Sequence, residues 1–323
     1  GKRVGISTTT EEEAFALSSG ATLGELLPLQ LQLMAARVSD PGFRTDEWNT
    51  WMASSAAAEA AAPYSAARVL DFNLQPMLHA GDLRWTYNTT EMRKGWKPAD
   101  AVAFIKPIIE KSPIEVIMVG GIDVERAILE VGKTFGALPA RAEKAEPPGL
   151  RSVTFPAPTA KPVVLKHKGR SDQGYAVIAW PTNLGFYTDP RAARAGMVLA
   201  DMLRDEATRQ LRTGNGSTYS PTVIDEFSYE LPDYGYIGMQ VELPPDKLDG
   251  VLAQIEGIAA DIANNQMPVS EVARITGPRI EQTRREQAAA AGYWIAFLAG
   301  TMKAPGKLDP LRTEIKDYQS LTP

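Results

Sequence analysis

A charged, proline-rich stretch that starts near Ala140 divides this 323-residue chain into two parts. Four charged residues are followed by closely spaced prolines, namely Arg141, Glu143, Lys144 and Glu146, then Pro147, Pro148, Pro156, Pro158 and Pro162. Such composition is typical of linkers between domains. The length points the same way, because a single hydrophobic core seldom organises this many residues. We predict a first domain over residues 1–145, a linker over 146–162 and a second domain over 163–323.

Hydrophobic periodicity before the linker predicts mostly helices. The predicted helices cover residues 23–38, 45–62, 66–78, 98–109 and 124–135. Residues 114–121 form an apolar run that ends in Gly120 and Gly121, which predicts a strand followed by a turn. Asp123 is then placed to cap the next helix.

After the linker the same kinds of element return. Strands are predicted over residues 163–165, 175–180, 217–227 and 236–243, and helices over 189–211, 246–264, 270–287 and 292–298. Strand runs and long helices are unevenly spaced in both parts, which favours an α+β fold over a doubly wound parallel sheet. The two parts have a similar order of elements, a weak indication of internal duplication.

Composition excludes several classes of function. The net charge of −5 argues against a nucleic-acid partner, and no apolar run is long enough to predict a membrane span. The chain has no cysteine and only two histidines, His79 and His167, and both H-x-x-E-H and H-E-x-x-H are absent. Zinc sites depend on histidine and cysteine ligands, so we predict no metal or other cofactor in this chain. His79 is expected to be an ordinary helix-end residue.

A hydrolase with its own nucleophile is a weak alternative. The serines occur in no G-x-S-x-G turn, and only two histidines could act as the base. This interpretation therefore has no motif to support it.

The most informative motif lies between the predicted helix 189–211 and the strand that follows. Arg212, Gly216 and Tyr219 have the spacing Arg-x-x-x-Gly-x-x-Tyr, directly after Leu211. This pattern is similar to one in the C-terminal half of zinc metallopeptidases of the pitrilysin/insulinase (inverzincin) family. By itself the pattern would occur often by chance, and Arg212 and Tyr219 would then be an ordinary loop arginine and a half-buried strand tyrosine.

Further landmarks in the family's order make the resemblance specific. They cover nearly the whole chain and comprise residues 40–43 (Asp-Pro-Gly-Phe), 119–123 (Val-Gly-Gly-Ile-Asp), 133–139 (Lys-Thr-Phe-Gly-Ala-Leu-Pro), 180–182 (Trp-Pro-Thr) and 293–294 (Tyr-Trp). The last pair resembles the long bacterial members in particular. The resemblance favours a periplasmic or secreted protein.

The resemblance implies two tandem, related α+β domains, each a mostly antiparallel sheet packed against helices. In the family, two such halves close around a chamber, and the N-terminal half binds zinc through H-x-x-E-H. The opposite half supplies an arginine and a tyrosine, which here correspond to Arg212 and Tyr219. Gly214 and Gly216 would let the substrate-binding loop pass close to a substrate backbone.

Without the zinc motif, the chain is expected to be inactive alone. Either it is a fragment, or its first domain is the degenerate copy found in the family's C-terminal halves. We predict a substrate-binding half whose partners are a zinc-bearing half or subunit and a peptide substrate. The alternative is a purely structural or binding subunit that makes no contact with the reacting groups.

Overall fold

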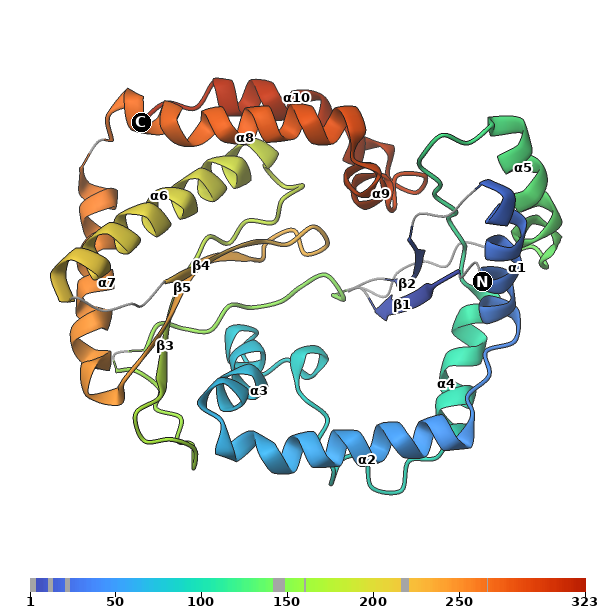
Figure 1. Ribbon diagram of the computed structural model, residues 1–323, viewed down its shortest axis with the longest axis horizontal. Helices are drawn as coiled ribbons and strands as arrows, with labels where there is room; N and C mark the ends of the chain where they lie inside the picture. Colours follow the sequence, from blue (N-terminus) through green and yellow to red (C-terminus); the bar gives the residue numbers. More distant parts are fainter. Residues whose placement is uncertain are drawn as a thin grey trace.

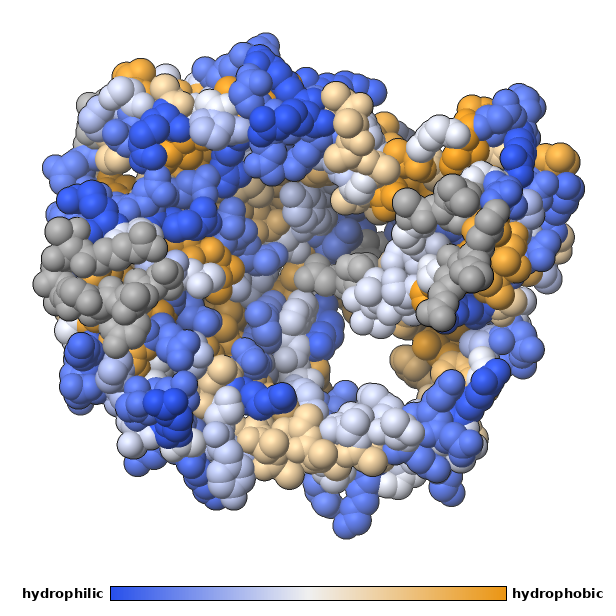
Figure 2. All heavy atoms as spheres, in the orientation of Figure 1, coloured by the Kyte–Doolittle hydropathy of each residue, from blue (hydrophilic) through white to orange (hydrophobic). Residues whose placement is uncertain are grey.

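The computed structural model describes residues 4–10, 14–20, 24–141, 149–159, 161–215, 221–265 and 267–323. Helices and strands follow one another around an open ring, with the N-terminus on one side and the C-terminus on the opposite side (Figure 1). The space-filling view shows this face hollowed beside α2 (Thr45–Ala61) (Figure 2). The mixture of helices and sheets confirms the predicted α+β character.

A three-stranded antiparallel sheet lies at the centre of one side of the ring. Its order is β3 (Gly174–Pro181), β5 (Gly235–Leu243), β4 (Thr222–Phe227), so β5 pairs with both neighbours. Alternate residues of a strand point to opposite faces, and β5 follows that rule. Ile237, Met239, Val241 and Leu243 enter one core, while Tyr236 enters another on the opposite face.

Two helices cover the first face of this sheet. They are α6 (Pro190–Asn215) and α7 (Leu248–Asn264). The side chain of Asp189 accepts a hydrogen bond from the backbone N–H of Ala192 at 2.9 Å, as expected of a residue that precedes a helix beginning with proline. Buried residues of α6 recur at helical spacing along this face, at Ala193, Ala200, Leu203, Ala207 and Leu211. Their small size at several positions lets the helix lie close to the strands.

A second layer of helices packs on α6 from the side away from the sheet. Val198 and Met202 of α6 contact buried side chains of α8 (Val269–Ala289) and α10 (Asp309–Gln319). The buried Arg194 of α6 forms an ion pair with Asp317 of α10 at 2.5 Å and donates to the carbonyl of Pro310 at 2.8 Å. Asp317 thus balances the positive charge of Arg194, which is buried away from water.

The opposite face of the sheet packs on α3 (Ala66–Leu78). Leu78 forms a cluster with Leu231, Tyr234 and Tyr236, and Trp85 and Phe155 complete it. The hydroxyl of Tyr234 donates to the carbonyl of Leu78 at 3.2 Å. A helix from before the predicted linker therefore covers a sheet from after it.

The remaining elements form the other side of the ring. They are the antiparallel pair β1 (Ile6–Thr10) and β2 (Phe15–Ser19), the helices α1 (Leu27–Ser39), α4 (Pro98–Lys111) and α5 (Val124–Lys133), and the short α9 (Ala291–Leu298). Helix α1 packs on α4 and α5. The carboxylate of Glu115 joins the segment between α4 and α5 to the segment that follows α9. It accepts hydrogen bonds from the backbone N–H groups of Gly300 at 2.6 Å and Met302 at 3.0 Å.

Two predicted strands were wrong. Residues 114–121 and 163–165 are extended but belong to no sheet. Their β-branched side chains favour strands, but that preference needs a neighbouring strand to pair with. Within the described ranges neither segment has one. Val163 and Val164 are instead exposed to solvent.

The close approach of α6 to β4 gives a testable prediction. A Cβ atom added to Gly196 of α6 would lie 2.3 Å from Cζ of Phe227 in β4. We expect Gly196→Ala to lower the free energy of unfolding by about 1–3 kcal/mol, because the helix must move away from the strand. Urea unfolding of the purified chain measures this change.

Gly257→Ala is the matched control. Gly257 lies inside α7, and an added Cβ meets nothing within 4 Å. Alanine favours a helix over glycine, so this variant should gain up to about 1 kcal/mol. Equal stability changes in the two variants would contradict the packing described here.

Candidate functional site

The structure places Arg212 and Gly214 in the last turn of α6. This helix ends at Asn215, four residues beyond its predicted end, so both backbones belong to the helix and not to a loop. Leu211 is buried in the core of the sheet. The side chain of Arg212 lies outside the described residues, as do Gly216 and Tyr219 altogether.

Both ends of the segment that carries the motif are anchored in the same core. On the upstream side Leu211 is buried between α6 and the sheet. On the downstream side Pro221 is buried, and β4 begins at Thr222, which pairs with Gln240 of β5. Since β4 is an edge strand, the motif segment joins α6 to the edge of the three-stranded sheet.

A cluster of charged side chains lies between α6, α8 and β4. The Nε atom of Arg279 donates to Oδ2 of Asp201 at 2.5 Å, and Nη2 of Arg279 lies 4.0 Å from Oδ2 of Asp225. Arg204 forms a second ion pair with Asp201. Burial raises the pKa of Asp225, and the positive charges of Arg279 and Arg204 oppose that rise. The sequence analysis did not single out these residues, because 78 positions separate Asp201 from Arg279 and no short motif joins them.

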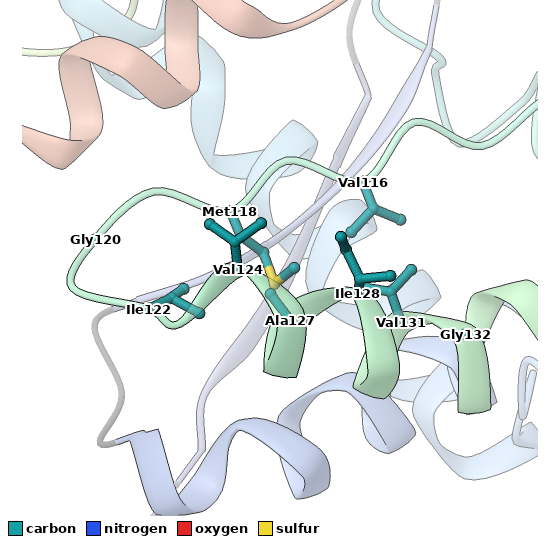
Figure 3. Close-up of a pocket in the computed structure, with 9 residues that line it drawn as sticks. All are labelled: Val116, Met118, Gly120, Ile122, Val124, Ala127, Ile128, Val131 and Gly132. Atoms are coloured by element: carbon teal, nitrogen blue, oxygen red, sulfur yellow. The ribbon is translucent and has the colours of Figure 1, made fainter.

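An apolar groove of about 630 Å³ lies on the other side of the ring, along α5 (Figure 3). Val116 and Met118 of the extended segment face Val124, Ile128 and Val131 of the helix. Gly120, Ile122, Ala127 and Gly132 complete the lining. The groove contains no titratable side chain, so it offers apolar contact and no acid–base chemistry.

The two histidines occupy unrelated places. His79 follows the last residue of α3 and is buried between the rings of Trp85 and Tyr234, at centroid distances of 4.0 and 4.6 Å. Its Nδ1 atom contacts the carbonyl of Gln75 at 2.8 Å. In His167, Nε2 lies 2.9 Å from the carbonyl of Gln173.

The described part of the chain has no cluster of three or more histidine, cysteine or acidic side chains that could hold a metal ion. Among the described helices, none combines the length and the apolar character that a membrane span requires.

Comparison with known families decides the identity of the fold. Residues 96–276, more than half of the chain, match the family model described as "Peptidase M16 inactive domain". The chain belongs to this family. The matched region contains α6, the motif segment and the three-stranded sheet. The family predicted from the sequence is therefore confirmed.

Solved structures of bacterial proteins have a similar fold. The periplasmic protease PqqL from Escherichia coli matches 99% of the chain with a TM-score of 0.77 at 13% sequence identity. A peptidase M16 inactive domain from Pseudomonas fluorescens matches 99% of the chain with a TM-score of 0.71 at 15% sequence identity. A protease from Helicobacter pylori matches 99% of the chain with a TM-score of 0.73 at 13% sequence identity.

This M16 chain spans only part of the length of these relatives. It spans 34% of the PqqL chain, 75% of the Pseudomonas chain and 76% of the Helicobacter chain. No curated protein sequence matches it.

The burial of His79 predicts a pH dependence of stability. Removal from water lowers the pKa of His79 below its usual 6.5. The unfolded chain then binds the proton more readily than the folded one. The stability from neutral His79 is fully present above pH 6.5 and is lost as the pH falls through that value towards the folded pKa.

His79→Phe keeps a ring between Trp85 and Tyr234 but removes the titrating group. We expect the urea concentration at the midpoint of unfolding to decrease in the wild type when the pH is lowered from about 8 to about 5. In the variant this decrease should be less steep. An unchanged slope in His79→Phe would show that another group causes the dependence.

Proposed function

We propose that this chain is the non-catalytic, substrate-binding half of a zinc-dependent endopeptidase that acts on peptides or unfolded polypeptides. The observation that carries the proposal is the match to the M16 inactive domain across residues 96–276, the region that contains the Arg212–Tyr219 spacing. The zinc-bearing half would be a separate part of the protease, since this sequence lacks H-x-x-E-H.

Arg212 and Tyr219 are the residues proposed to meet the substrate. An arginine fork carries several N–H donors in one plane and can hold a substrate carbonyl or carboxylate with two of them. A tyrosine hydroxyl can donate a hydrogen bond to the oxyanion of a tetrahedral intermediate. When bound in the partner half, zinc would activate the attacking water. Gly214 and Gly216 would leave room beside these side chains for a substrate backbone.

The larger arrangement is also part of the proposal. We infer two tandem, related domains over residues 1–145 and 163–323, joined by a linker over 146–162. This chain, with its two domains, would form one half of the protease, and it would enclose the substrate together with the zinc-bearing half. Resemblance to PqqL, a periplasmic protease, supports a periplasmic location.

A purely structural or binding subunit is the alternative function. It would have the same fold and could pair with the same partner, but Arg212 and Tyr219 would not contact the reacting groups. Because the two functions differ only in that contact, substitution of these two residues distinguishes them.

In the assembled protease, we expect Tyr219→Phe to lower kcat by about 100-fold, the usual effect of removing one oxyanion donor. Arg212→Ala should lower kcat/KM by about tenfold or more, because the substrate loses a bidentate contact. Cleavage of a quenched fluorescent peptide measures both constants.

Arg209→Ala is the control for this experiment. Arg209 precedes Arg212 by three residues on α6, and its exposed side chain pairs with Glu206 of the same helix. Such surface pairs contribute little, so activity should stay within about twofold of the wild type. Full activity in both Arg212→Ala and Tyr219→Phe would contradict the proposed function and favour the structural subunit.

A further inference from the structure

Arg279 contacts both α6 and β4. It lies on α8, and its Nε atom donates to Oδ2 of Asp201 on α6 at 2.5 Å. Its Nη2 atom donates to the carbonyl of Met197, one turn earlier on α6, at 3.3 Å. The same Nη2 lies 4.0 Å from Oδ2 of Asp225 on β4. One guanidinium group therefore touches the helix that leads into the motif segment and the strand that leads out of it.

These contacts are largely shielded from water. Only 25% of the side chain of Arg279 is exposed, compared with 18% for Asp201 and 30% for Asp225. The guanidinium also lies over the ring of Tyr318 on α10, 6.0 Å from its centroid. A partly buried ion pair with a fixed fork geometry constrains its partners more strongly than an exposed pair.

Arg274, five residues earlier on α8, has different contacts from Arg279. Arg274 also reaches α6, where it pairs with Asp205 at 2.8 Å, and it pairs with Glu271 on its own helix at 2.8 Å. Its side chain is 53% exposed. Neither of these two partners lies on β4. Arg274 thus joins α8 to α6 alone, whereas Arg279 joins α6 to β4.

The direction of α6 affects Arg212 strongly because the helix is long. Arg212 follows Asp201 by eleven residues, which corresponds to about 16 Å along a helix at ~1.5 Å per residue. A tilt of about 5° at Asp201 would move the end of the helix by about 1.4 Å. A displacement of about 1 Å at a reacting group can cost about 100-fold in rate. Apolar packing against the sheet holds α6 down but is not directional, whereas the Asp201–Arg279–Asp225 contacts are.

We propose that Arg279 is a positioning residue, which fixes α6 relative to β4 and thereby sets the place of Arg212 and Tyr219 against the substrate. This inference rests on the proposed function. Arg279 touches no substrate itself and acts through the two elements that flank the motif. It acts through a hydrogen bond to Asp201 and through the charge of Asp225, 4.0 Å away.

The test uses the assembled protease with Arg279→Met, which keeps much of the apolar stem and removes the fork. We expect kcat to fall about tenfold and KM to change less than about twofold, because contacts made in the transition state are displaced. Asp225→Asn, which keeps the size of the side chain and removes its charge, should lower kcat by about threefold. Arg274→Met is the control and should leave kcat within about twofold.

A double-mutant cycle separates positioning from a general loss of stability. When Arg212→Ala and Tyr219→Phe are both already present, Arg279→Met should lower kcat by less than about twofold, since the contacts that it displaces are gone. A thermal melt of each variant identifies those that fold, and Asp225→Asn decides the matter if Arg279→Met does not fold.

Two results would overturn the inference while the proposed function stands or is untouched. In the first, Arg279→Met lowers kcat equally with and without the Arg212→Ala and Tyr219→Phe pair, so that the effects are independent. In the second, Tyr219→Phe lowers kcat but Arg279→Met and Asp225→Asn do not, so that the proposed function stands and the positioning role fails. If neither Tyr219→Phe nor Arg212→Ala affects activity, the proposed function itself fails and the inference fails with it.

Discussion

The packing of α6 against the three-stranded sheet is the constraint on which the rest of this side of the molecule depends. The helix brings Leu203, Ala207 and Leu211 onto Met239 and its neighbours in the sheet core, and Gly196 lets it approach Phe227 of β4. From its other side, α8 and α10 pack on Val198 and Met202. A helix buried on two faces has little freedom to shift.

This arrangement would support the proposed contribution of the motif segment to catalysis. The motif segment begins at the end of a rigid helix and finishes at an edge strand that is paired with β5. Residues on such supports need little reorganisation when a substrate binds, which is the condition for efficient stabilisation of a transition state. The groove along α5 is lined by apolar residues and offers no acid–base groups.

Much of the fold could be predicted from local patterns. The apolar periodicity of α1, α3 and α6 and the alternation in β3 and β5 placed these elements correctly, and Asp123 caps α5 as expected through a 2.8 Å hydrogen bond from the backbone N–H of Arg126. Residues 114–121 and 163–165 failed because strand formation depends on a partner that no local pattern reveals. The strand β2 and the helix α10 were not predicted. The roles of Arg212 and Tyr219 came from family resemblance, and they stay predictions. Arg279 could not be found from the sequence, because its partners on α6 and β4 are distant along the chain.

The central claim is that this chain completes a protease whose zinc is held elsewhere. The most direct measurement is hydrolysis of one fluorogenic peptide by this chain alone, by a zinc-bearing half of the same protease alone, and by the two mixed in equal amounts. We expect no hydrolysis by this chain, weak hydrolysis by the zinc-bearing half, and an increase of about 100-fold or more in the mixture. Hydrolysis by this chain alone, or a zinc-bearing half that is equally active without it, would rule out the proposed function.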